Sequence, residues 1–195
     1  MPMLRPMCET TIAPNTTANR PAFAFEAAVF AVLATLGVCS RLLIEIPNFS
    51  AVAACALFGG FYFRRRWMVV ALPIVTMLLS DLALGFYSPM LMASVYLSLA
   101  MAAALGRVVR SNPRLGFGVG ATLAGSVLFF LCTNFAVWAG SQWYTQDLKG
   151  LAHCFTLALP FFRYTLMSDV LFASAIFGAW ALARRFGARA AVATA

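Results

Sequence analysis

The stretch ALPIVTMLLSDLALGFY, which runs from Ala71 to Tyr87, decides the fold class of this protein. It is almost wholly apolar, yet it carries one carboxylate, Asp81, near its far end. An apolar segment of about 20 residues is long enough to cross the hydrocarbon core of a bilayer as a helix. The stretch therefore predicts a transmembrane helix, and a charge within such a helix requires either a partner or a wet cavity.

The composition of the whole chain agrees with a membrane location. Hydrophobic residues make up 63% of the sequence and charged residues only 10%. A soluble domain carries about 25% charged residues, which it needs to cover its surface. We therefore predict an integral membrane protein.

Six segments with this apolar character follow one another, and they predict an all-α, polytopic protein of six transmembrane helices. The predicted spans are residues 22–43, 50–63, 67–86, 89–106, 115–139 and 161–183. The second span is short unless the chain is already helical from Pro47, with Asn48 or Ser50 as its cap. Residues 151–160 are too few to span and end at Pro160, so we expect an interfacial or re-entrant helix there.

Basic residues alternate between connections and predict the orientation. They gather between spans two and three, between spans four and five, and after span six, as Arg64, Arg65, Arg66, Arg107, Arg110, Arg114, Arg184, Arg185 and Arg189. Cytoplasmic loops carry such an excess of arginine and lysine. We therefore expect both termini in the cytoplasm of a bacterial inner-membrane protein. The domains would be a disordered tail (1–21), a transmembrane domain (22–183) and a basic tail (184–195).

With this orientation, most polar residues of the spans fall near the outer surface. Asp81, for example, lies about five residues before the end of an outward-running span, or roughly 8 Å deep. We predict an outward-facing polar pocket that binds a small molecule, in which His153 also contributes. The candidate substrate-binding residues are Arg41, Asn48, Asp81, Asn134, Trp138, Tyr144, Arg163 and Asp169.

The same charges allow a purely structural interpretation. The acids Asp81 and Asp169 are matched in number and depth by Arg41 and Arg163. Such groups inside a membrane pair with one another when they do not line a cavity. Ion pairs and a pocket are compatible, because the charges in a cavity wall also need compensation.

Metal and nucleotide chemistry find no support in the sequence. The five cysteines stand singly and His153 is the one histidine, so neither a zinc site nor a disulfide framework is predicted. No Walker motif occurs, and the arginines are divided among separate loops, which argues against nucleic-acid binding. We predict no cofactor.

Several long motifs resemble a bacterial family of integral membrane proteins described as candidate transport proteins. They are PNFSAVAACALFGGFYF (47–63), LPIVTMLLSDLALGF (72–86), VYLSLAMAAALGR (95–107), LFFLCTNFAVWA (128–139) and GLAHCFTLALPFFRYTLMSDVLFASAIFG (150–178). That family is similar in turn to the substrate-binding S components of energy-coupling factor (ECF) vitamin transporters. The resemblance implies a six-helix S-component-like bundle that captures a small nutrient. It also implies a transmembrane coupling protein and two cytoplasmic ATPases as partners.

Three hypotheses about function remain open at this point. The first is a membrane-embedded substrate-binding subunit for nutrient uptake. The second is a structural or scaffold membrane protein whose buried charges are helix–helix ion pairs. The third is an intramembrane enzyme in which Asp81 and Asp169 share a proton, although each acid has an arginine at similar depth. We favour the first and expect no enzymatic activity.

Overall fold

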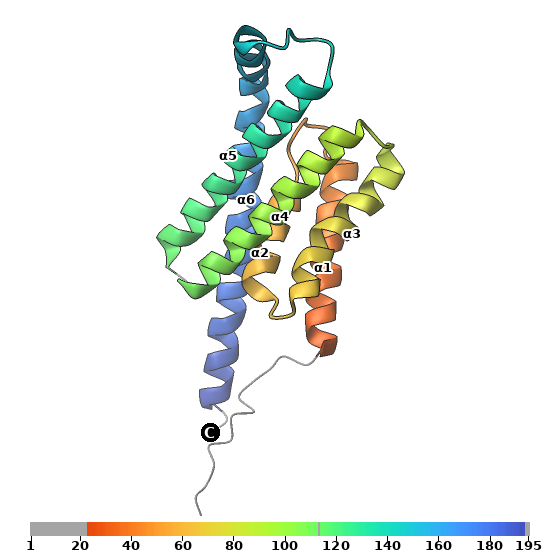
Figure 1. The fold of residues 1–195 in the computed structure, drawn as a ribbon. Coiled ribbons are helices and arrows are strands. Elements are labelled where there is room, and N and C mark those ends of the chain that lie inside the picture. The colour runs from red at the N-terminus through yellow and green to blue at the C-terminus, as the bar shows by residue number, and fades with distance from the viewer. Residues whose placement is uncertain (1–22, 113, 194–195) are drawn as a thin grey trace, which may run out of the picture.

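The protein is all-helical throughout the part of the chain that the computed structural model describes, residues 23–112 and 114–193. Six helices follow one another (Figure 1): α1 (Phe23–Leu43), α2 (Val52–Tyr62), α3 (Arg66–Leu84), α4 (Pro89–Ser111), α5 (Leu115–Gly140) and α6 (Leu148–Ala193). This confirms the predicted all-α fold. The predicted N-terminal tail, residues 1–21, lies outside the described residues.

Five of these helices, α1 and α3 to α6, are long and apolar enough to cross a membrane, which indicates a membrane protein. The exception is α2, which is apolar but has only 11 residues. At about 1.5 Å per residue such a helix covers only half of a hydrocarbon core of about 30 Å. A sixth complete crossing therefore stays a prediction.

The two ends of the bundle differ in charge. One end, at the bottom of Figure 1, holds the start of α1, the end of α6 and the connections α2–α3 and α4–α5. We call it the basic end, because Arg64, Arg65, Arg66, Arg107, Arg110 and Arg114 lie in or beside those two connections. The other three connections lie at the opposite end. The predicted grouping of the arginines is thus present, whereas its cytoplasmic location stays a prediction.

The short helix α2 is the centre of the bundle and contacts all five other helices. Nine of its 11 residues are buried, and it carries no charge. A helix that is apolar on every side is stable only when neighbours surround it completely. Its core includes Leu57 and Phe58, which pack with buried side chains of α1, α3 and α4.

Two glycines bring α2 and α4 into backbone contact. A Cβ atom added to Gly60 would lie 1.8 Å from the carbonyl oxygen of Ala103. One added to Gly106 would lie 1.9 Å from the carbonyl oxygen of Leu57. Small residues at helix crossings allow such close approach within membranes. The α2–α4 crossing therefore depends on the absence of these two side chains.

The start of α2 differs from the prediction. The helix begins at Val52, and its N-cap residue, Ala51, makes no side-chain capping hydrogen bond. Asn48 has a φ of 60°, the left-handed region that asparagine tolerates better than most residues. The chain from Pro47 is therefore a turn and not a first helical turn, and the predicted caps at Asn48 and Ser50 are wrong.

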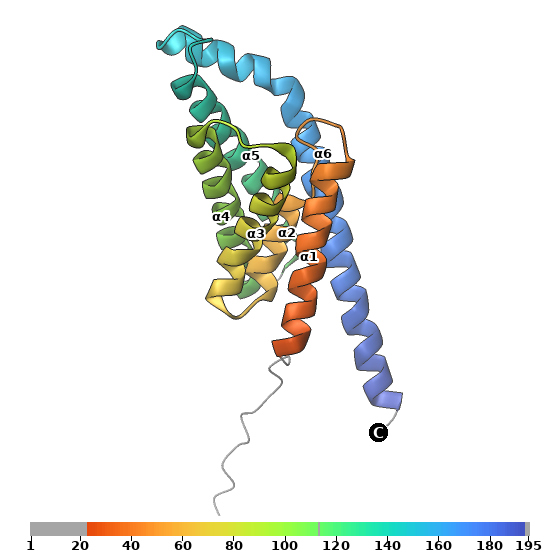
Figure 2. The ribbon, with the colours of Figure 1, turned by 90° about the vertical axis from the view of Figure 1, so that its right-hand side faces the viewer.

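The predicted interfacial segment is continuous with the last span. Residues 148–193 form one helix of 46 residues, α6, with Pro160 in its interior. Figure 2 shows that the first part of α6 runs across the end of the bundle before the helix turns along it. A proline lacks the N–H that would bond to the carbonyl four residues earlier, which bends a helix without ending it.

Candidate functional site

A cavity of about 480 Å³ lies at the end of the bundle opposite the basic end. Its floor includes Val52 and Ala53, the first residues of α2. Because α2 is only half as long as its neighbours, the surrounding helices extend past it and enclose this space. The cavity is thus a direct consequence of one short helix in the centre of a long bundle.

The cavity wall is mainly apolar, with a few polar groups. A pocket of this size and character is typical of small-molecule sites, which fall in the range of about 300–1,000 Å³. The polar and charged lining residues are Arg41, Asn48, Ser50, Tyr87, Thr133, Asn134, Thr165, Ser168 and Asp169. Four of the eight predicted binding residues, Arg41, Asn48, Asn134 and Asp169, therefore share this cavity.

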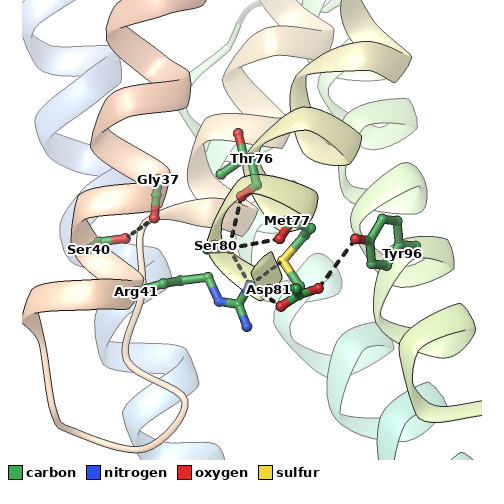
Figure 3. Close-up of polar contacts among 8 residues, drawn as sticks. All are labelled: Gly37, Ser40, Arg41, Thr76, Met77, Ser80, Asp81 and Tyr96. Atoms are coloured by element: carbon green, nitrogen blue, oxygen red, sulfur yellow. Dashed lines mark hydrogen bonds and ion pairs between the residues drawn. The ribbon is translucent and has the colours of Figure 1, made fainter. Parts of the chain in front are cut away.

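Arg41 and Asp81 form an ion pair between α1 and α3. The Nη1 atom of Arg41 lies 2.7 Å from Oδ1 of Asp81, and it also donates to Ser80 Oγ (Figure 3). The hydroxyl of Tyr96, on α4, donates to the other carboxylate oxygen at 3.3 Å. Asp81 has no exposed side-chain surface, whereas Arg41 is 19% exposed. Arg41 therefore lines the cavity, and Asp81, which is buried on the side of Arg41 away from the cavity, neutralises the charge of Arg41.

A single nitrogen of Arg41, Nη1, makes all the hydrogen bonds of its guanidinium group among the described residues. Nη1 also lies 3.3 Å from the sulfur of Met77. A guanidinium has five N–H donors, spread over three nitrogens. Nε and Nη2 make no hydrogen bond to the part of the chain that the structure describes, so Arg41 retains donors for another group.

Asp169 lies in α6 and is bound to α5 instead of to an arginine. Ser126 Oγ donates to its Oδ2 atom at 2.6 Å. The side chain is buried, with the residue 4% exposed, and it lines the cavity. None of the ion pairs among the described residues involves Asp169.

The structural interpretation, in which both acids pair with arginines, therefore does not hold for Asp169 in the described part of the chain. Arg163 is exposed, and its Nη2 atom donates to the hydroxyl of Tyr164 at 2.8 Å. The guanidinium carbon of Arg163 also lies 4.7 Å from the centroid of the Tyr164 ring. Arg163 does not line the cavity. Of the two acids that this interpretation matches with arginines, Asp81 forms an ion pair, with Arg41, and Asp169 forms none among the described residues.

The two aspartates also have separate partners. Asp81 is bound by Arg41 and Tyr96, and Asp169 by Ser126. Two carboxylates that share a proton lie in direct contact. No hydrogen bond joins Asp81 to Asp169 in the described part of the chain, which leaves the aspartyl dyad without structural support.

Trp138 lies in the last turn of α5 and Tyr144 in the connection between α5 and α6, and neither lines the cavity. Trp138 Nε1 donates to the carbonyl of Thr145 at 3.0 Å, which closes this connection into a compact loop. The ring of Tyr144 packs edge-on against His153, with centroids 5.8 Å apart. These aromatic residues shape the loop, not the cavity wall.

A carboxylate at the end of this loop caps α6. Asp147 accepts hydrogen bonds from the backbone N–H of Gly150 and the hydroxyl of Thr145, both at 2.7 Å. These hydrogen bonds, that of Gly150 above all, hold the pKa of Asp147 below its usual value. An aspartate that binds the N–H three residues later is the ordinary N-cap of a helix.

Sequence reasoning missed the two side chains that donate hydrogen bonds to the aspartates, Tyr96 and Ser126. Tyr96 and Ser126 lie in apolar spans, and only the packing of α4 and α5 shows that they face the aspartates. Glu26, which is buried at the basic end 3.3 Å from Nε of Arg65, was also missed. Its position in the first turn of α1, opposite a run of arginines, was the available signal.

The chain belongs to the family of unknown function DUF6580, whose model matches residues 22–191. No curated protein and no solved structure matches it. The family description assigns no substrate, partner or activity.

Proposed function

We propose that this member of the DUF6580 family is a membrane-embedded substrate-binding subunit that takes part in uptake of a small nutrient. In this proposal both termini lie in the cytoplasm, and the cavity opens to the outside of a bacterial inner membrane. The arginines at the basic end support that orientation, because cytoplasmic loops are rich in them. A transmembrane coupling protein and two cytoplasmic ATPases, as in ECF transporters, are the partners that the sequence resemblance implies.

The cavity is the observation that carries this proposal. It combines a volume of about 480 Å³, an apolar wall, and two charged groups, Arg41 and Asp169, that retain binding capacity. Ligand sites have this combination of apolar surface and few polar groups. A helix bundle with only a structural role gains nothing from such a space, since an unfilled cavity costs stability.

Native mass spectrometry of the purified protein tests the proposal. We expect the wild-type protein to retain a small metabolite. Ala158 lines the cavity, and Ala158→Trp should fill it and abolish retention. The neighbouring Leu159 is 55% exposed and lies outside the cavity lining, so Leu159→Trp is the matched control and should retain the metabolite. If each of the three proteins shows only the mass of its own polypeptide, with no bound metabolite, a substrate-binding role is contradicted.

A scaffold role is the second candidate, because the ion pair of Arg41 with Asp81 ties α1 to α3. In that case exchange of the charges in the double variant Arg41→Asp/Asp81→Arg should restore the stability that either single change removes. The double variant should then also retain the cellular function of the wild-type protein, because a scaffold needs the ion pair between α1 and α3 and not a particular direction of its charges. In a substrate-binding subunit the same exchange moves the cation away from the cavity and abolishes metabolite retention.

A further inference from the structure

We infer that the cavity binds a small organic monocation, an ammonium group on an apolar or aromatic body, with the ammonium placed against Asp169. This inference rests on the proposed function and specifies its substrate class. It follows from the charges that line the cavity, the partners they already have, and the chemistry of the remaining wall.

The charge balance of the cavity favours a cation. Among the described residues that line it, Arg41 and Asp169 are the charged ones. The positive charge of Arg41 is compensated by Asp81, whose Oδ1 lies 2.7 Å away. Asp169 has no such counter-charge in residues 23–112 and 114–193. With both acids ionised, the site therefore carries one uncompensated negative charge.

The surroundings of Asp169 make that charge costly in an empty cavity. The residue is 4% exposed, and Ser126 donates a single hydrogen bond to its Oδ2 atom. Its Oδ1 atom accepts no hydrogen bond from the residues that the structure describes. A buried carboxylate is stable in ionised form only when it is paired and hydrogen-bonded. A ligand ammonium group meets both needs, since it supplies a positive charge and several N–H donors.

The aromatic wall favours the same class of ligand. Phe129, Phe130, Phe161 and Phe162 line the cavity, and the rings of Phe130 and Phe162 lie 4.5 Å apart between centroids. Aromatic faces attract cations through the ring quadrupole and also bury apolar groups. The free donors of Arg41 then suit a neutral acceptor on the ligand, such as a hydroxyl or carbonyl, because the charge of Arg41 is already neutralised.

Three indole compounds that differ in their terminal group test the assignment: tryptamine (cation), tryptophol (neutral) and indole-3-acetate (anion). The measurement is the shift in melting temperature of the full chain in detergent at neutral pH, titrated with each compound. We expect tryptamine to bind at least roughly tenfold more tightly than the other two. Asp169→Asn keeps the shape of the side chain without its charge, and it should remove this preference. Ala158→Trp should abolish the shift for every compound.

Three results would overturn the assignment. The first is that tryptophol or indole-3-acetate binds the wild-type protein as tightly as tryptamine or more tightly. The second is that Asp169→Asn binds tryptamine as tightly as the wild-type protein does. The third is that tryptamine causes no shift in melting temperature up to about 10 mM, a range in which fragments bind cognate pockets. If Asp169→Asn does not fold, the ranking on the wild-type protein decides. If the wild-type protein prefers tryptophol or indole-3-acetate and Ala158→Trp abolishes that binding, the cavity is still a solute site, but for a different substrate class. The proposed function itself fails only if the purified protein also retains no metabolite.

Discussion

Asp81 is a carboxylate with no exposed side-chain surface between apolar helices, and its burial requires compensation. Arg41 supplies a full charge, and the hydroxyl of Tyr96 supplies a further hydrogen bond. Removal of one partner of a buried ion pair leaves the other charge uncompensated, which costs more than the pair contributes. Asp81 therefore controls the position of Arg41 in the cavity wall as well as the stability of the bundle.

We predict that Asp81→Asn lowers the free energy of unfolding by about 3 kcal/mol. The physical reason is that the Arg41 guanidinium, 19% exposed, loses its counter-charge. Unfolding of the detergent-solubilised protein measures the change. In the double variant Arg41→Gln/Asp81→Asn the loss should be smaller than the sum of the two single losses. Additive losses would show that the two side chains are not coupled.

The structural interpretation of the sequence, in which arginines compensate the buried acids, holds for Asp81 and does not hold for Asp169 among the described residues. Arg41 and Asp81 lie near the ends of two parallel neighbouring helices, α1 and α3, at the same depth, and orientation alone brings them together. Arg163 and Asp169 are six residues apart on one helix, α6, so they point in different directions. The partner that Asp169 has, Ser126, depends on how α5 and α6 pack, which a single sequence does not specify.

Among the elements, α2 has the tightest constraints, because its backbone touches that of α4 at Gly60 and Gly106. We predict that Gly106→Leu separates these helices and destabilises the protein by at least about 3 kcal/mol, as overpacking of a rigid contact does. The control is Gly118→Leu in α5, where an added side chain meets open space. A comparable loss of stability in both variants would contradict this role for the crossing.

The start of α6 is stabilised by a titratable cap, which gives it a pH dependence. Because hydrogen bonds from Gly150 and Thr145 lower the pKa of Asp147, its capping contribution is complete above the usual aspartate value of about 4. The contribution is lost as the pH falls through the lower pKa of the folded state.

Hydrogen exchange at the first backbone amides of α6 measures this loss. After correction for the intrinsic exchange rate, protection should fall at acidic pH in the wild-type protein. The variant Asp147→Asn retains a capping side chain that does not titrate, so its protection should not change over the same range. An identical pH profile in both proteins would contradict the assignment of the cap.

Hydropathy predicted the positions of the helices because each must be apolar over a length set by the bilayer. It did not predict where α2 begins, since Pro47 and Asn48 also suit a turn. It also did not show that residues 148–193 form one bent helix, because a proline is compatible with both a break and a kink. These are differences of packing, which local sequence does not encode.

In the molecule as a whole, the cavity and the cluster of arginines lie at opposite ends of the helix bundle. The short central α2 leaves a cavity at one end, and the basic residues gather at the other. If the arginines lie in the cytoplasm, the cavity opens outward. The proposed uptake of a nutrient depends on this orientation, because a cavity that opened inward would not capture solute from outside.

Labelling of single cysteines in intact cells with a membrane-impermeant maleimide tests that orientation most directly. In a variant whose native cysteines are replaced by alanine, Asn48→Cys places a thiol at an exposed position of the cavity wall, and Ser111→Cys places one at the end of α4 near the basic end. We expect Asn48→Cys to react in intact cells and Ser111→Cys to react only after the cells are permeabilised. The reverse pattern, with Ser111→Cys labelled from outside and Asn48→Cys protected, would contradict an outward-facing substrate cavity.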